Sequence, residues 1–152
     1  MSRGTERQKC LTAFQLLRRL EESDNWGRCE CIVTGQVKHY KEMHGGHYIS
    51  RKCLATEMDK DNVWPQCPGS NFYGGEADKL IYREKLIKKM GVDRVERLES
   101  LYQASRGSDD AIAKLSEDDM SLLVIKSTEA EYKEIRKEIM KKVKDLQRKK
   151  NI

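Results

Sequence analysis

The sequence predicts an α+β fold in which short β-hairpins are embedded among several α-helices. Apolar residues recur at helical spacing near both ends of the chain, in residues 10–20 and 132–146. Between these segments, residues 31–76 contain all three histidines, three of the five cysteines and both prolines. Short apolar runs in this stretch are bounded by Gly, Pro, Asn and Asp, which is typical of strands and turns. We therefore expect the chemistry of the protein in residues 31–76.

Capping residues indicate where the helices begin and end. Thr128 and Glu131 form a capping box at the start of the last helix. Ser116 resembles another helix start, which favours a helix over a strand in residues 111–127, and Gly91 is a suitable C-terminal stop. The expected elements are a helix at 6–21, a hairpin within 32–40, strands at 47–50 and 63–64, and helices from residue 70 or 76 to 91, from 92 to 102, within 111–127 and from 129 to 146.

Length and charge limit the class of protein. The chain has 152 residues, enough for one modest core, and we divide it into an N-terminal helix (1–25), a central core (26–91) and a helical, basic region (92–152). The net charge of +5 favours a polyanionic partner such as nucleic acid. The sequence has no apolar run of transmembrane length and no apolar signal-peptide core, so we expect a cytoplasmic protein with no membrane partner.

Two short motifs have the outline of zinc knuckles. Cys31-x-x-Thr34-Gly and Cys67-x-x-Ser70 each match a C-x-x-C pattern with the second thiolate replaced by a hydroxyl. A hydroxyl is a poor zinc ligand, so structural zinc is doubtful. An alternative zinc site would combine Cys31 and Cys67 with Cys29 and Cys53, although the C-x-C spacing is awkward for one ion.

His47, Asn62 and Asn71 form the most informative combination. A nuclease of the His-Asn-His type needs a histidine that takes a proton from water, a polar residue that holds the histidine tautomer, and a divalent metal that stabilises the developing charge. In such sites the base comes from the first strand of a hairpin, the orienting Asn comes from the connecting loop, and a metal-binding His or Asn comes from the start of the following helix. The order of His47, Asn62 and Asn71 fits this plan.

The combined string GHYISR, then NV-x-x-QC, then S-N-x-x-x-G, resembles the phage NinG/Rap recombination nucleases, in which a knuckle is followed by similar motifs. The resemblance extends from Trp26 through the helices that follow the motif. It implies an HNH-like ββα-metal core and a structure-selective endonuclease for branched DNA, such as Holliday junctions and D-loops. It also implies a requirement for Mg²⁺ or Mn²⁺.

The resemblance further implies roles for individual residues. His47 would be the general base, Asn62 would orient it or shape the loop, and Asn71 would bind the metal. Arg51 would contact phosphate, and we add Lys52 beside it. Two of the four knuckle ligands would remain, at Cys31 and Cys67, because the family pattern has cysteines at the positions of Thr34 and Ser70.

Several points stay open. Many sites of this type carry an Asp or His before the base, where this chain has Gly46, so His44 or His39 would have to supply the second metal ligand. His44 is equally well explained as a surface histidine. Lys137, Lys141 and Lys144 are candidates for DNA binding or for an ordinary solvated face.

Assembly and activity have alternatives too. Three explanations of the apolar stripe from Tyr132 to Leu146 are open: packing on the core, a homodimer interface, or a binding surface for another protein such as a recombination protein. The alternative to an endonuclease is a branched-DNA-binding recombination accessory protein that does not cleave.

Overall fold

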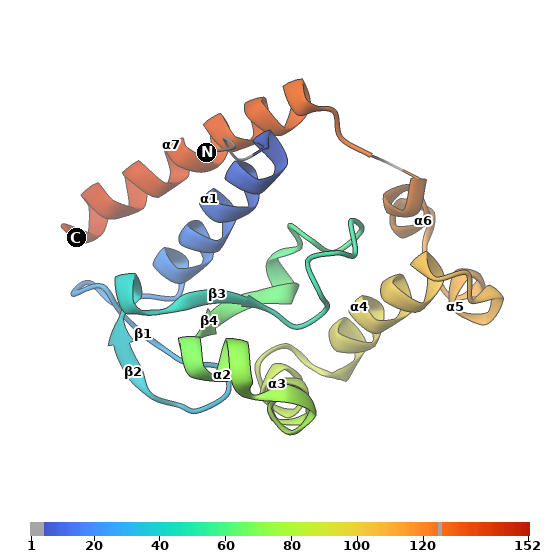
Figure 1. Cartoon of the computed structure of the whole chain (residues 1–152), viewed down its shortest axis with the longest axis horizontal. Coiled ribbons are helices and arrows are strands. Elements are labelled where there is room, and N and C mark those ends of the chain that lie inside the picture. Colours follow the sequence, from blue (N-terminus) through green and yellow to red (C-terminus); the bar gives the residue numbers. More distant parts are fainter. Residues whose placement is uncertain (1–4, 125) are drawn as a thin grey trace.

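The fold is α+β, as the sequence predicts. The computed structural model describes residues 5–124 and 126–152, except for the side chains of residues 72 and 73. Within these residues, helices surround two small antiparallel sheets of two strands each (Figure 1). None of the described helices is both long and apolar enough to cross a bilayer.

The two terminal helices pack along each other. α1 (Glu6–Glu21) has the predicted bounds, and α7 (Glu129–Lys150) runs beside it (Figure 1). The predicted capping box of Thr128 and Glu131 is present at the start of α7. The apolar stripe of α7 is therefore covered within the chain, which confirms its interpretation as core packing. Its buried side chains are Tyr132, Ile139 and Val143.

The first sheet pairs β1 (Arg28–Glu30) with β2 (Val37–His39). The predicted hairpin lies in the right segment, but placing its first strand at residues 32–33 was wrong. Residues 31–36 instead form a tight connection, in which the Cys31 N–H donates to Gln36 O at 2.8 Å and the Gly35 N–H donates to Cys31 O at 3.0 Å. A one-turn helix, η1 (Tyr40–Glu42), leads to the second sheet.

The second sheet pairs β3 (His44–His47) with β4 (Val63–Gln66). The second strand was predicted, whereas the first was placed three residues too late, at 47–50. The glycines explain the error, because they let β3 lie against α1. A Cβ on Gly45 would lie 2.7 Å from the Cβ of Gln15, so alternation of side chains could not identify this strand.

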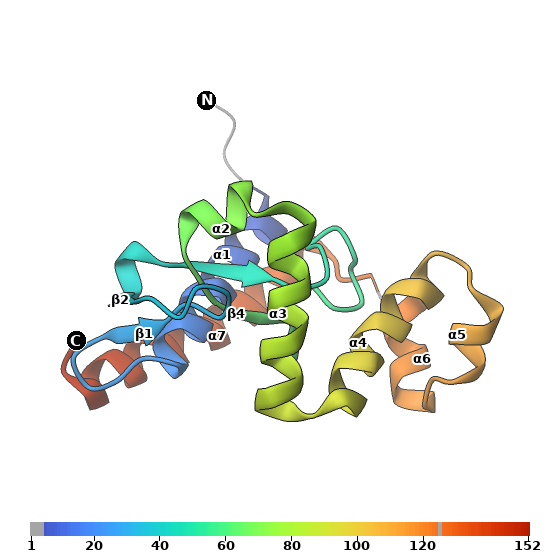
Figure 2. The ribbon, with the colours of Figure 1, turned by 90° about the horizontal axis from the view of Figure 1, so that it is seen from below.

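The remaining helices follow β4. The predicted stop at Gly91 is confirmed, since this residue has a φ of 88° and ends the long third helix. Ser116 caps the sixth helix through the Asp119 N–H at 3.1 Å, as predicted. The fourth, fifth and sixth helices form an arm beside the sheets (Figure 2). The elements are η2 (Lys60–Asn62), α2 (Pro68–Tyr73), α3 (Gly75–Met90), α4 (Val92–Ser105), α5 (Asp109–Ala113) and α6 (Glu117–Val124).

Salt bridges attach the loop between β3 and β4 to α4. Arg97 of α4 binds Asp59 of the loop at 2.7 Å and Asp119 of α6 at 2.9 Å. Arg94, one turn earlier, binds Asp61. Ion pairs with α4 thus hold the loop in place, and with it the loop residues that line the site.

Candidate active site

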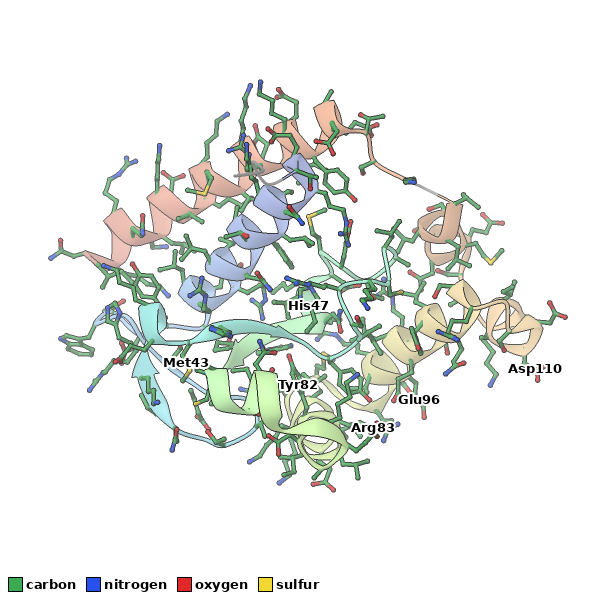
Figure 3. All side chains as sticks on the ribbon, viewed as in Figure 1. Met43, His47, Tyr82, Arg83, Glu96 and Asp110 are labelled. Carbon is green, nitrogen blue, oxygen red and sulfur yellow. The ribbon has the colours of Figure 1, made fainter. Side chains whose placement is uncertain are left out.

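His47 is the last residue of β3 and lies near the middle of the molecule (Figure 3). Its Nε2 is 2.8 Å from the carbonyl oxygen of Glu57. A carbonyl only accepts hydrogen bonds, so Nε2 carries the proton and Nδ1 is the unprotonated nitrogen. Nδ1 has no hydrogen-bond partner among the residues that the structure describes. Burial lowers the pKa of His47, and the Glu57 hydrogen bond opposes this shift in part. Burial therefore favours the neutral form of the imidazole.

Glu57, whose carbonyl sets this tautomer, has a buried carboxylate held from both ends of the chain. The Arg7 Nε donates to Glu57 Oε2 at 2.8 Å, and the Tyr132 hydroxyl donates to Glu57 Oε1 at 2.5 Å. Burial and this hydrogen bond raise the pKa of Tyr132 to about 12, so the phenol stays protonated as a donor. The position of the Glu57 carbonyl thus depends on α1 and α7.

Asn62 closes η2 and is fully buried. Its side chain accepts from the Ile49 N–H at 2.7 Å and donates to the carbonyls of Ile49 and Thr56, each at 3.0 Å. Asn62 therefore joins both ends of the connecting loop, and no hydrogen bond joins it to His47. Of the two roles considered from the sequence, the geometry is that of a residue that shapes the loop.

Asn71 lies in α2, and its amide Nδ2 is 3.2 Å from Nδ1 of His44. If Nδ2 donates to that nitrogen, the amide oxygen Oδ1 points elsewhere. Burial, and then the nearby Arg19 cation, lower the pKa of His44, which keeps its ring neutral and able to accept. His44 and His47 both line one cavity, but not through the bend at Gly45 and Gly46 that we expected from the sequence to be required, since both glycines are paired within strand β3.

That first cavity has a volume of about 500 Å³ and lies between α1, β3 and the loop after β3. Arg19 and Arg51 line it, and no carboxylate does so among the described residues. Arg19 is fixed by donating to the carbonyls of Tyr40 at 3.0 Å and Met43 at 2.8 Å. The cavity is suited to an anion, and its polar lining comes from Thr12, Gln15, Arg19, His44, His47, Ser50, Arg51 and Asn71.

The contribution of α1 was missed from the sequence. Thr12, Gln15 and Arg19 are spaced by three and four residues and so share one helix face. The spacing can be read from the sequence, but the sequence alone does not indicate which element this helix face packs against.

A second cavity, of about 360 Å³, shares His47 and Asn71 with the first. Its other walls carry Gln66 and the acidic side chains of Glu76 and Asp78. His47 and Asn71 therefore stand between a cationic cavity and one that contains carboxylates.

Comparison with known families gives one result for nearly the whole chain. The family described as Bacteriophage Lambda NinG protein matches residues 6–150. The chain belongs to the NinG family. The match includes α1 and α7, so both terminal helices belong to the NinG unit that holds Glu57. No curated protein and no solved structure matches the chain.

The knuckle positions of this NinG-family chain are joined by hydrogen bonds. Cys31 Sγ accepts from the Cys67 N–H at 3.1 Å, and the Thr34 hydroxyl lies 3.6 Å from Cys67 Sγ. Ser70 instead bonds Gln66 and Asp78. Burial alone would raise the pKa of Cys31, but hydrogen bonds from Thr34 and Cys67 lower it.

The other two thiols considered for zinc lie in different surroundings. Cys53 Sγ is 3.7 Å from the Ser105 hydroxyl, and burial raises the pKa of Cys29. Within the described parts of the chain, no group of three or more His, Cys, Asp or Glu side chains is placed to hold a metal. The residues present therefore do not form a tetrahedral zinc site.

A hydrated magnesium ion suits the donor atoms better. Mg²⁺ prefers oxygen ligands, retains several waters and often binds only one or two protein groups together with phosphate. The amide oxygen of Asn71 is a donor of the type that Mg²⁺ takes, and the carboxylates of Glu76 and Asp78 add negative charge nearby. His44 would have to exchange its bond to Asn71 for the metal.

The remaining candidates for DNA binding are exposed. Arg51 and Lys52 lie in the loop after β3, and only Arg51 lines the first cavity. On α7, Lys137 pairs with Glu134 at 3.1 Å and Lys141 pairs with Glu138 at 3.2 Å.

Proposed function

We propose that this NinG-family protein is a divalent-metal-dependent endonuclease that hydrolyses phosphodiesters in branched recombination intermediates such as Holliday junctions and D-loops. The observation that carries the proposal is the tautomer of His47. Its Nε2–H is committed to the Glu57 carbonyl, which leaves Nδ1 as a base beside the cationic first cavity. β3, the loop, β4 and α2 follow one another in the order of a ββα-metal core.

In the proposed reaction, Arg19 and Arg51 bind the scissile phosphate in the first cavity. His47 Nδ1 takes a proton from the attacking water as the water oxygen bonds to phosphorus, and the Glu57 carbonyl stabilises the resulting imidazolium through its hydrogen bond to Nε2. The P–O bond to one sugar oxygen breaks, and this leaving oxygen takes a proton from solvent. Asn62 keeps the loop in the conformation that presents this carbonyl. Asn71 would hold the divalent ion, which supplies electrostatic stabilisation of the developing charge when bound. Shape and backbone charge, not base sequence, would select branched DNA.

Cleavage of a labelled four-way junction tests the proposal. With Mg²⁺ present, we expect the wild-type protein to nick the junction and His47→Ala to lose activity by about 10²- to 10⁴-fold, the usual effect of removing a general base. His39→Ala is the matched control, because His39 caps η1 through the Lys41 N–H and lines neither cavity. Equal activity of wild type and His47→Ala would refute the assignment.

One observation favours a second candidate, a branched-DNA-binding protein that does not cleave. Gly46 stands where many sites of this type have an acid, and the first cavity has no carboxylate among the described residues. Tight junction binding without nicking in either Mg²⁺ or Mn²⁺ would support this candidate and exclude the endonuclease.

A further inference from the structure

The space beside Gly46 is filled by a side chain from the neighbouring strand. A Cβ built on Gly46 would lie 1.9 Å from Gln66 Oε1 and 2.9 Å from Gln66 Cβ. Gln66, at the end of β4, is buried. Its amide oxygen therefore occupies the position where a side chain of residue 46 would begin, directly before the proposed base.

A chain of hydrogen bonds fixes which way this amide points. The Ser70 hydroxyl donates its one proton to Asp78 Oδ2 at 2.8 Å. It must therefore accept from Gln66 Nε2, which is 2.9 Å away. Rotating the amide would place the Gln66 oxygen against a hydroxyl that has no proton left to give. Gln66 Oε1 is thus directed away from Ser70.

Gln66 Oε1 has no hydrogen-bond partner among the residues that the structure describes, although the side chain is buried at the wall of the second cavity. Among the described residues, the side-chain atoms that are both sealed from solvent and unpartnered are Glu6 Oε2, Thr56 Oγ1 and Arg136 Nε, so Gln66 Oε1 is itself accessible from the cavity and can take a ligand there. The same cavity is lined by Asn71, a candidate oxygen ligand, and by the carboxylates of Glu76 and Asp78, against which stands one cation, Lys79. A hard cation would satisfy the Gln66 oxygen and be attracted by both carboxylates.

We propose that Gln66 Oε1 is a protein ligand of the divalent cation, together with Asn71, and replaces the acid that position 46 lacks. Ser70 and Asp78 are positioning residues that act through the Gln66 amide. The inference rests on the proposed function in one respect: the cation at Gln66 is the same cation that hydrolysis would use. It also gives Ser70, which stands at the second altered knuckle position, the role of orienting the Gln66 amide.

Binding of Mn²⁺ to the DNA-free protein, measured by electron paramagnetic resonance, tests the assignment. We expect Gln66→Leu to weaken Mn²⁺ binding by about tenfold or more, as for loss of a metal-site group. Gln66→Glu keeps one oxygen toward the cation and adds charge, while its second oxygen competes with Asp78 for the Ser70 proton, so this variant should retain the Mn²⁺ binding that Gln66→Leu loses. Gln103→Leu, an exposed glutamine on α4, is the matched control and should bind normally.

Ser70→Ala provides a second variant that leaves the proposed ligand in place. We expect it to weaken Mn²⁺ binding, because the amide is then free to rotate. The same Mn²⁺ affinity in wild type, Gln66→Leu and Ser70→Ala would overturn the proposal, as would a wild-type protein that binds no Mn²⁺. If Gln66→Leu does not fold, Ser70→Ala and Gln66→Glu decide the question.

This measurement is independent of cleavage. A protein that binds Mn²⁺ through Gln66 but never nicks DNA would retain the metal assignment and lose the endonuclease. If the wild-type protein nicks DNA but the Gln66 variants bind Mn²⁺ with unchanged affinity, the endonuclease proposal stands and the assignment of Gln66 as a metal ligand is wrong.

Discussion

At the scale of single residues, the hydrogen bonds of each polar side chain show which of its atoms remain available for catalysis or binding. His47 has one nitrogen committed to the Glu57 carbonyl, and Asn62 has both ends of its amide committed to the loop. Hydrogen bonds thus separate the atoms that shape the site from those left for chemistry. Under this division, His47 keeps a free nitrogen for the role of base that we propose, and Asn62 holds the loop in shape.

The lowered pKa of His47 predicts the pH dependence of cleavage. The base works unprotonated, and burial holds its pKa below the ordinary value of 6.5. Cleavage should therefore persist at pH 6.5 and fall only as the pH drops further, through the folded-state pKa. The measurement is the rate of junction cleavage against pH at saturating Mg²⁺.

A neighbouring cation provides the control for this profile. Arg51 lowers the pKa of His47, so Arg51→Gln should move the midpoint of the acid limb to higher pH. Lys52→Gln removes the same charge one residue further on and should leave the midpoint in place. A wild-type midpoint above 6.5 would contradict the neutral base.

At the scale of elements, the knuckles connect the hairpins through hydrogen bonds between thiols, hydroxyls and amides. Hydrogen bonds join Cys67 to both Cys31 and Thr34. Ser70 instead donates to Asp78 and lines the second cavity. The two replaced ligands therefore have separate structural roles. Losing two of four ligands removes most of the affinity for tetrahedral zinc.

We predict that the wild-type protein, purified without chelator, contains far less than stoichiometric zinc and melts at the same temperature with and without a chelator. Thr34→Cys combined with Ser70→Cys should bind one zinc per chain and become sensitive to chelator. Elemental analysis and thermal melts measure both effects. Stoichiometric zinc in the wild-type protein would show that the hydrogen-bonded knuckle is the wrong description.

The sequence predicted elements wherever a local signal sets the boundary. The capping boxes and Gly91 act within one helical turn, so these helix ends were correct. β3 was misplaced because its glycines are set by contact with Gln15 of α1, and this contact is absent from any local pattern. The placement of Gln66 could not be predicted for the same reason, since its side chain fills the space that Gly46 leaves across the sheet.

At the scale of the whole molecule, positive charge is spread over several surfaces, and only part of it faces the site. Lys137, Lys141 and Lys144 recur at spacings of four and three residues along the exposed side of α7. Lys144 has no ion pair among the described residues, whereas the other two are paired with glutamates. Exposed pairs of this kind contribute little to stability, so both lysines remain available to phosphate.

Replacing these three lysines by glutamine should weaken junction binding at all sequences and lower the slope of log K against log salt by about 1 for each lysine–phosphate interaction that is removed. Lys88, Lys114 and Lys126 are also exposed, and their replacement makes the same change of charge elsewhere. Fluorescence anisotropy over a salt series, without divalent metal, measures both effects. If both triple variants lower the slope equally, α7 has no special role in binding.

The two partners of the Glu57 carboxylate lie 125 positions apart, at Arg7 near the beginning and Tyr132 near the end. During synthesis on the ribosome, residues 47, 62 and 71 all emerge before the last of these partners does. A nascent or prematurely terminated chain therefore holds His47, Asn62 and Asn71, while its Glu57 carboxylate has only the Arg7 partner. Completion of the final helix supplies the Tyr132 hydroxyl, the second donor to the residue whose carbonyl bonds His47 Nε2.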